Sequence, residues 1–125
     1  MIRGNSIMRT LWMALLGFGL TVTGAQAADL AAGKAAYEKY TCVSCHGADA
    51  KTPMQPDYPI LAGQHPDYLA HALTAYQRGQ AGAPASANVR KNAIMGAMAS
   101  QLTAADIENI AAWLSEQPSP LAVRK

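Results

Sequence analysis

The sequence predicts an all-α domain with about three main helices, and three observations lead to that fold class. The chain is rich in alanine, whereas valine, isoleucine and phenylalanine are scarce outside its N-terminal segment; such a composition favours helices over strands. Apolar residues recur three and four positions apart in three stretches, as on one face of a helix. Large side chains are few for so small a domain, so a large apolar cofactor would fill the centre.

The first helix is expected over residues 30–40. Leu30, Gly33 and Tyr37 fall on one face of it. A glycine inside a helix costs about 1 kcal/mol relative to alanine. Gly33 therefore predicts close approach of another helix at that point.

A proline-containing loop is expected over residues 47–63, followed by a second helix that begins near Pro66, a residue suited to a first helical turn. Gly79 is expected to end this helix. Its apolar stripe would consist of Leu69, Ala72, Leu73 and Tyr76. The next stretch, QAGAPASANVRKN at residues 80–92, is typical of a loop.

The third helix has the clearest start signal. Thr103 is a good N-cap, and Asp106 lies three residues further on, where it can complete a capping box. Pro118 and Pro120 close the domain. The residues expected on its apolar face are Ile107, Ile110, Ala111 and Leu114, with Trp113 beside them.

The N-terminal 27 residues are typical of a secretory signal peptide. Arg3 and Arg9 precede an apolar run at residues 11–20, and Ala25-Gln26-Ala27 resembles a cleavage site. An uncleaved membrane anchor is the alternative, but the run is shorter than the roughly 20 apolar residues of a span. We therefore expect cleavage after Ala27, a periplasmic protein without stable membrane insertion, one domain over residues 28–120 and a tail over residues 121–125.

The charges of the chain are nearly balanced. The chain has ten Lys and Arg and eight Asp and Glu, which give a formal net charge of +2. Without Arg3 and Arg9 the net charge falls to about zero. No basic stripe points to nucleic acid. Nor does the sequence show a carboxylate pair or a base beside a nucleophile, so we do not expect an enzyme.

The stretch CVSCH carries the chemistry. Cys42 and Cys45 are three apart, and on a helical turn they face the same side, where each could form a thioether with one haem vinyl group. His46 follows and would be an axial ligand of the iron. Three alternatives are weaker. A zinc site needs four ligands, and only Cys42, Cys45 and His46 are local; a thioredoxin-like redox pair expects a βαβ context; a structural disulfide leaves the histidine unexplained.

Methionine together with histidine is a common axial pair for such a haem. Met95 and Met98 follow a full circuit of the expected fold, whereas Met54 lies only eight residues beyond His46. His65 and His71 are rival ligands that we expect to be surface residues. Arg90 and Lys91 could pair with haem propionates or be solvated.

The chain resembles class I cytochromes c, and more narrowly one half of the bacterial periplasmic two-haem cytochromes and their single-haem relatives. The similarity rests on three segments, GKAAYEKYTCVSCHG, YPILAGQHPDYLAHALTAYQRG and IMGAMASQLTAADIENIAAWLSEQ. It implies a small all-α fold around one covalently bound haem c per chain. Two residues depart from the family pattern. The family usually has a glycine two places after the ligand methionine, whereas Gly96 directly follows Met95. Ala50 stands where a glycine is common in the loop after the cysteine motif.

The resemblance also implies the role of individual residues. Cys42 and Cys45 would hold the haem, and His46 and Met95 would ligate the iron, with Met98 as the alternative distal ligand. Pro59 would accept a hydrogen bond from His46. Gly33, Tyr37 and Trp113 would lie where the first and last helices cross.

These features predict a periplasmic electron carrier whose partners are a donor and an acceptor protein. Two alternatives are the cytochrome subunit of a periplasmic dehydrogenase complex and a haem-based ligand-binding protein with an open sixth position. The sequence leaves the oligomeric state open between a monomer and a weak dimer.

Overall fold

The computed structural model describes residues 27–121, and within this range all regular structure is helical. The expected signal peptide, apart from Ala27, and the tail after Leu121 lie outside the described residues. The elements are α1 (Leu30–Lys39), α2 (Val43–His46), α3 (Pro66–Gln80), the 3-10 turn η1 (Ala85–Ala87), α4 (Ala93–Ala99) and α5 (Ala104–Ser115). The predicted all-α class is confirmed, with α1, α3 and α5 as the three main helices.

Helices α1 and α5 cross at very short range. A Cβ atom built on Gly33 would lie 2.1 Å from the backbone oxygen of Asn109, so only glycine permits this crossing. One turn further along α1, the rings of Tyr37 and Trp113 pack with their centroids 5.0 Å apart. The predicted close approach at Gly33, and the meeting of these three residues, are confirmed.

The start of α5 follows its sequence signal. The Thr103 side chain accepts from the Asp106 backbone N–H, and the Asp106 carboxylate accepts from the Thr103 N–H, which completes the capping box. The predicted apolar face is buried in full: Ile107, Ile110, Ala111, Trp113 and Leu114.

Helix α3 begins at Pro66 as expected but does not end at Gly79, which lies inside its last turn. That prediction was wrong because Gly79 serves packing and does not adopt a left-handed conformation. A Cβ atom there would lie 2.1 Å from the backbone oxygen of Arg90. The stretch before α4 therefore rests directly on the last turn of α3.

Helix α4 was not predicted as a helix. It is short, and its N-cap is Asn92, whose side chain accepts from the Met95 N–H at 2.9 Å. The helix packs on α3, which in turn packs on α5. Its amphipathic pattern spans only seven residues, too few for the periodicity to stand out from the surrounding small residues.

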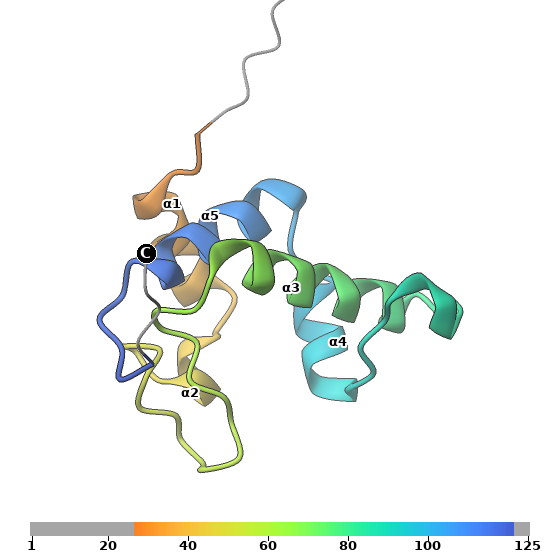
Figure 1. The fold of residues 1–125 in the computed structure, drawn as a ribbon, viewed down its shortest axis with the longest axis horizontal. Coiled ribbons are helices and arrows are strands. Elements are labelled where there is room, and N and C mark those ends of the chain that lie inside the picture. Colours follow the sequence, from red (N-terminus) through yellow and green to blue (C-terminus); the bar gives the residue numbers. More distant parts are fainter. Residues whose placement is uncertain (1–26, 122–125) are drawn as a thin grey trace, which may run out of the picture.

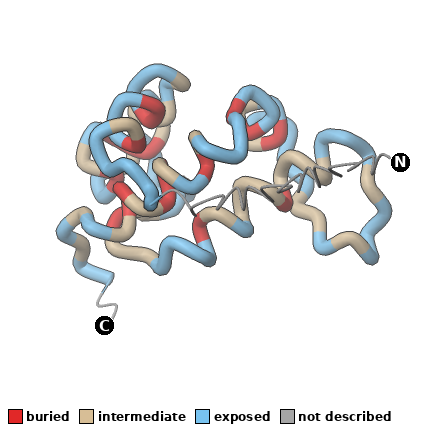
Figure 2. Tube along the Cα trace, turned by 90° about the horizontal axis from the view of Figure 1, so that it is seen from above, coloured by how far each residue is buried: buried red, intermediate tan, exposed pale blue. Residues whose placement is uncertain are grey.

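The elements divide into two regions (Figure 1). Helix α2 and its following loop lie near the α1–α5 pair, whereas α4 lies beneath the far half of α3. Buried residues gather around α1 and α5, while residues 81–92 include none that is buried (Figure 2). Within residues 27–121, no helix combines the length and the apolar character needed to span a membrane.

Candidate haem-binding site

The chain turns sharply between α1 and the cysteine pair. The Thr41 N–H donates to the Glu38 carbonyl at 3.0 Å, and the Cys42 N–H donates to the Tyr37 carbonyl at 3.1 Å. This pattern is a Schellman motif, in which the residue at the Thr41 position is usually glycine. Thr41 instead adopts a left-handed φ of 57°, a conformation that is strained for a β-branched residue. The turn places α2 directly after α1.

The two cysteines lie on the single turn of α2. Cys42 has helical backbone angles and Cys45 follows three residues later, so both thiols lie toward one side. Both are free and half-buried, and burial raises the pKa of Cys42. Within residues 27–121, no group of three or more His, Cys, Asp or Glu is arranged to hold a metal ion. The arrangement fits two thioether links to one edge of a haem.

His46 is buried, with 6% of its surface exposed. Its Nδ1 lies 3.1 Å from the Pro59 carbonyl oxygen. A carbonyl can only accept, so Nδ1 carries the proton and Nε2 keeps its lone pair for a metal. Burial lowers the pKa of His46, which favours the neutral form that ligates iron. The contact with Pro59 is the one that the resemblance implied.

The loop that carries Pro59 is tied to the core by contacts that the sequence did not predict. The buried Tyr37 hydroxyl donates to the Gly47 carbonyl at 2.8 Å, and burial raises the pKa of that hydroxyl strongly. The Tyr58 ring lies 6.2 Å from the His46 ring, measured between centroids. Tyr58 adjoins Pro59 in the sequence, but only the folded loop reveals its closeness to His46.

Ala50 anchors the same loop. It is fully buried with a left-handed φ of 55°, and its carbonyl accepts from the N–H groups of Leu61 and Ala62. Glycine adopts this conformation more readily than alanine, because it has no Cβ. The loop over residues 47–63 thus closes back on itself and brings Pro59 to His46.

The three candidate methionines lie in different environments. Met54 is 70% exposed, whereas Met95 and Met98 are half-buried on α4. The Met98 sulfur faces the exposed Gln101 amide at 3.9 Å, and the Met95 sulfur accepts no hydrogen bond from the described residues. This difference leaves the Met95 sulfur the freer of the two.

Gly96, the residue directly after Met95, does not form a turn of the backbone. Gly96 instead lies within α4, where a Cβ atom would lie 2.6 Å from the Gln80 side-chain oxygen on α3. Its position is explained by contact with the Gln80 side chain on α3, so it does not distinguish Met95 from Met98.

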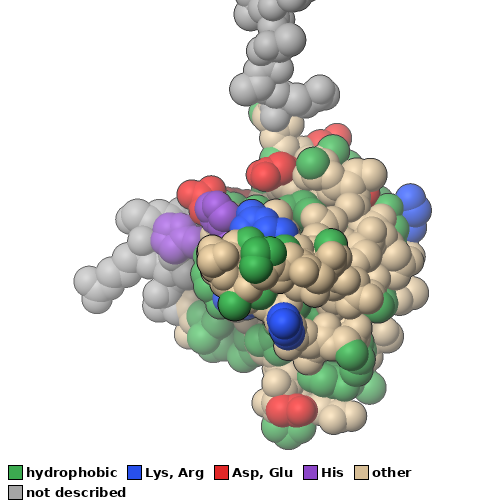
Figure 3. Space-filling model, turned by 90° about the vertical axis from the view of Figure 1, so that its right-hand side faces the viewer, with side chains coloured by type: hydrophobic (Ala, Val, Ile, Leu, Met, Phe, Trp, Pro, Cys, Tyr) green, Lys and Arg blue, Asp and Glu red, His purple; other side chains and the backbone are tan. Residues whose placement is uncertain are grey.

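The remaining candidates lie at the surface. His65 and His71 are both exposed, as predicted, and histidine side chains are visible at the surface in Figure 3. The Arg90 guanidinium donates to the Tyr68 hydroxyl at 3.0 Å and lies over the rings of Tyr68 and Tyr76. Arg90 is thus not simply solvated, and its pairing with haem propionates stays a prediction. Lys91 is exposed.

Comparison with known proteins supports a haem at this site. The cytochrome c family matches residues 30–118. Cytochrome c-554(548) of Halomonas halodenitrificans is 41% identical over 80 residues, which are 62% of this chain and 84% of that protein. Cytochrome c4 of Stutzerimonas stutzeri is 36% identical over 110 residues, which are 87% of this chain and 50% of that protein.

A solved structure shows the same arrangement of helices. The crystal structure of reduced recombinant cytochrome c4 from Pseudomonas stutzeri matches with a TM-score of 0.64 and 36% identity, over 74% of this chain and 47% of that one. The chain therefore spans about half the length of these cytochromes c4. These similarities imply a covalently bound haem c with its iron.

Proposed function

The chain belongs to the cytochrome c family and is an electron-transfer haem protein, and we propose that it is a periplasmic single-haem carrier with His46 and Met95 as axial ligands. The observation that carries this proposal is the geometry of His46. Its Nδ1–H is held by the Pro59 carbonyl at 3.1 Å, so the ring presents Nε2 as the only nitrogen able to bind iron.

The residues around the site have distinct tasks. When bound, the haem supplies an iron that alternates between the ferrous and ferric states. Cys42 and Cys45 attach it on the α2 side, and Pro59 fixes the orientation of the His46 ring. Met95 approaches from α4, where its sulfur has no competing hydrogen bond from the described residues. A sulfur ligand opposite the histidine raises the reduction potential.

An electron carrier, rather than an enzyme, suits this site. A closed sixth position leaves no room for a substrate at the iron, and electrons can leave through surface contact alone. Exposed apolar side chains lie near both proposed ligands. Met54 (70% exposed) lies in the loop after α2, and Ile94 (62% exposed) lies on α4. Brief apolar contact with a donor and an acceptor protein would use such surface.

The test compares Met95→Ala with Met98→Ala in the haem-loaded protein. Met95→Ala should abolish the weak absorbance band of sulfur-to-ferric-iron charge transfer and open the ferrous iron to carbon monoxide. It should also lower the reduction potential by a large fraction of the roughly 0.8 V that axial ligands command. Met98→Ala should keep the band and cost about 2–4 kcal/mol of unfolding free energy.

Three results would contradict the proposal, each in a different way. If the band survives in the Met95 variant and is lost in the Met98 variant, Met98 is the ligand. If the unaltered protein already binds carbon monoxide rapidly, the sixth position is open and the protein is a ligand-binding haem protein. A haem that leaves in acidified acetone would contradict attachment through Cys42 and Cys45.

A further inference from the structure

A single glutamine fastens the methionine-bearing helix to α3. The side-chain Nε2 of Gln77 lies 2.9 Å from the carbonyl oxygen of Ala99 and 2.9 Å from that of Leu102. Ala99 is the last residue of α4, and Leu102 immediately precedes the N-cap of α5. Gln77 therefore uses both protons of one amide to hold the turn between α4 and α5.

The two carbonyls need this amide to different extents. The Ala99 carbonyl also accepts from the Leu102 N–H at 3.0 Å. Among residues 27–121, Gln77 is the only donor to the Leu102 carbonyl. Ala99 and Leu102 are both buried, with 0% and 8% of their surface exposed. Removing the amide would leave a carbonyl unpaired in a buried turn, a cost that water cannot readily offset there.

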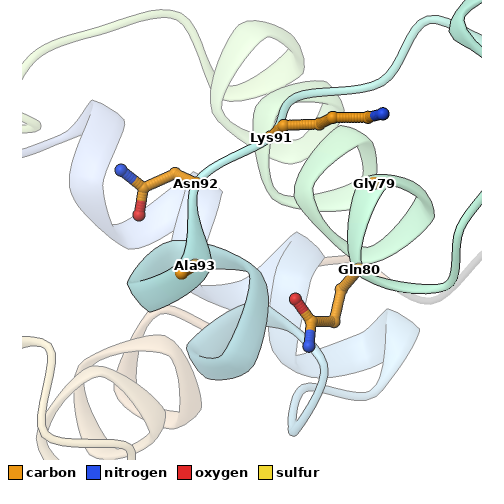
Figure 4. Close-up of a pocket in the computed structure, with 5 residues that line it drawn as sticks. All are labelled: Gly79, Gln80, Lys91, Asn92 and Ala93. Atoms are coloured by element: carbon orange, nitrogen blue, oxygen red, sulfur yellow. The ribbon is translucent and has the colours of Figure 1, made fainter.

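The opposite end of α4 is held by separate contacts. The chain that leads into it is fastened to α3, where the Arg90 N–H donates to the Ala75 carbonyl at 3.0 Å. A pocket of about 220 Å³ lies between the last turn of α3 and the first residue of α4, lined by Gly79, Gln80, Lys91, Asn92 and Ala93. In Figure 4 the Lys91 side chain points away from α4, and the Gln80 side chain reaches from α3 toward α4. The Gln77 contacts therefore act at the C-terminal end of α4, next to the turn into α5.

We propose that Gln77 is a positioning residue that keeps the α4 methionine at the haem iron. This inference rests on the proposed function, since it requires a methionine of α4 as the sixth ligand. Gln77 touches neither methionine in the described contacts and acts through the α4–α5 turn. When the amide is lost, α4 gains freedom at its C-terminal end, and the sulfur spends more time away from the iron.

The test measures how readily imidazole displaces the methionine sulfur from the ferric iron. An external ligand binds only while the sulfur is away, so its apparent Kd is inversely proportional to the open fraction and falls as that fraction rises. Gln77→Leu should lower the apparent Kd for imidazole about tenfold, because an unpaired buried carbonyl favours any arrangement that exposes it. The sulfur–iron band of the variant should remain visible without imidazole.

Gln117→Leu is the matched control. The Gln117 amide also donates to a backbone carbonyl, that of Trp113 at 2.9 Å, but it follows α5 and does not contact α4. Its loss should lower the unfolding temperature to a similar degree and leave the apparent Kd for imidazole within twofold of the unaltered protein. If Gln77→Leu behaves like Gln117→Leu, Gln77 is merely structural and the inference is overturned.

A second variant, Gln77→Glu, keeps the inference testable if Gln77→Leu does not fold. Gln77→Glu keeps the length of the side chain, but an ionised carboxylate has no proton to donate, whereas the protonated form has one. Relative to the unaltered protein at each pH, its apparent Kd for imidazole should be lower at neutral pH and recover as the solution is acidified. A pH-independent ratio would overturn the inference. If the unaltered protein lacks the sulfur–iron band, the proposed axial ligation fails first and this inference falls with it.

Discussion

The two helix pairs of this protein are held together by different forces. At the α1–α5 crossing, backbone meets backbone at Gly33, and the Tyr37 and Trp113 rings pack in a buried cluster. At the α3–α4 pair, no residue of α4 belongs to that cluster, and Gln77 on α3 donates hydrogen bonds to the carbonyl of Ala99, the last residue of α4, and to that of Leu102 beyond it. The first pair supports the cysteines and His46, and the second carries the methionines.

This difference between the two helix pairs suggests that the two regions around the proposed haem site differ in rigidity. The region of the proposed histidine ligand lies on the buried core and would be fixed further by covalent attachment of the haem, so it can hold residues in strained conformations, such as Thr41 and Ala50 with φ near 55°. The region of the proposed methionine ligand depends on a few directional contacts, each worth about 1 kcal/mol. We therefore expect ligand exchange at the iron to begin on the α4 side.

The largest difference in stability between the two helix pairs should come from a glycine-to-alanine substitution made in each. Gly33→Ala places a Cβ 2.1 Å from the Asn109 backbone oxygen, and backbone cannot move aside without separating α1 from α5. We expect a loss of about 3 kcal/mol or more, at the upper end for overpacking. Denaturant unfolding followed by circular dichroism measures it.

Gly96→Ala is the counterpart at the α3–α4 pair. Its Cβ would meet the side chain of Gln80, which is exposed and can rotate away. Alanine also gains about 0.5–1 kcal/mol over glycine within a helix, so the net change should be under about 1 kcal/mol. Equal losses for the two alanine variants would contradict the distinction between a rigid and an adaptable helix pair.

A smaller effect is expected where a polar contact joins the α1–α5 pair. The Asp106 carboxylate accepts from the Thr103 N–H at 3.0 Å and from the Tyr40 hydroxyl at 3.1 Å. The Thr103 contacts, more than that with Tyr40, hold the pKa of Asp106 below its ordinary value. Asp106→Ala should cost about 1 kcal/mol of unfolding free energy at neutral pH.

The sign of the pH dependence follows from the lowered pKa. The carboxylate stabilises the fold at pH values above the ordinary pKa of about 4, and this contribution disappears as pH falls through the lower pKa of the folded state. The difference in unfolding free energy between Asp106→Ala and the unaltered protein should therefore become smaller in strong acid. Asp67→Ala, in the first turn of α3, is the control. The difference in unfolding free energy between this variant and the unaltered protein should be small at every pH. A difference for Asp106→Ala that grows in acid would reverse this sign.

The smallest effect should be a gain in stability at the strained turn before α2. Thr41→Gly replaces a β-branched residue at φ 57° with the residue that Schellman motifs prefer. Relief of strain of about 1–2 kcal/mol is partly offset by the greater freedom of glycine in the unfolded chain. We expect a net gain of up to about 1 kcal/mol in thermal or denaturant unfolding.

Thr41→Asn serves as the intermediate variant, because asparagine tolerates the left-handed conformation better than threonine but less well than glycine. Its stability should fall between the two. If glycine destabilises the protein instead, the Thr41 side chain contributes more than its backbone strain costs, and the region of the proposed histidine ligand would store no strain at this turn.

Local signals in the sequence were sufficient for much of this protein. The capping box at Thr103 and Asp106, the first turn at Pro66 and the spacing of Cys42, Cys45 and His46 involve residues within one or two turns of each other. Such signals do not depend on the rest of the fold, so they appear in the folded chain where the sequence predicts them. Gly33 belongs with them, because a glycine in the middle of a helix lowers helix stability, and close packing of a second helix offsets that cost.

Contacts between distant segments were decided only by the tertiary structure. Gly79 was predicted to end α3, yet it lies against Arg90, and Gly96 lies against Gln80. Gln77 shows no pattern in the sequence that distinguishes it from any other helical glutamine, but the fold brings it to carbonyls 22 and 25 residues away. A glycine or an amide has the same local properties whatever it packs against, so its partner, and with it the position of α4, depends on how the helices assemble.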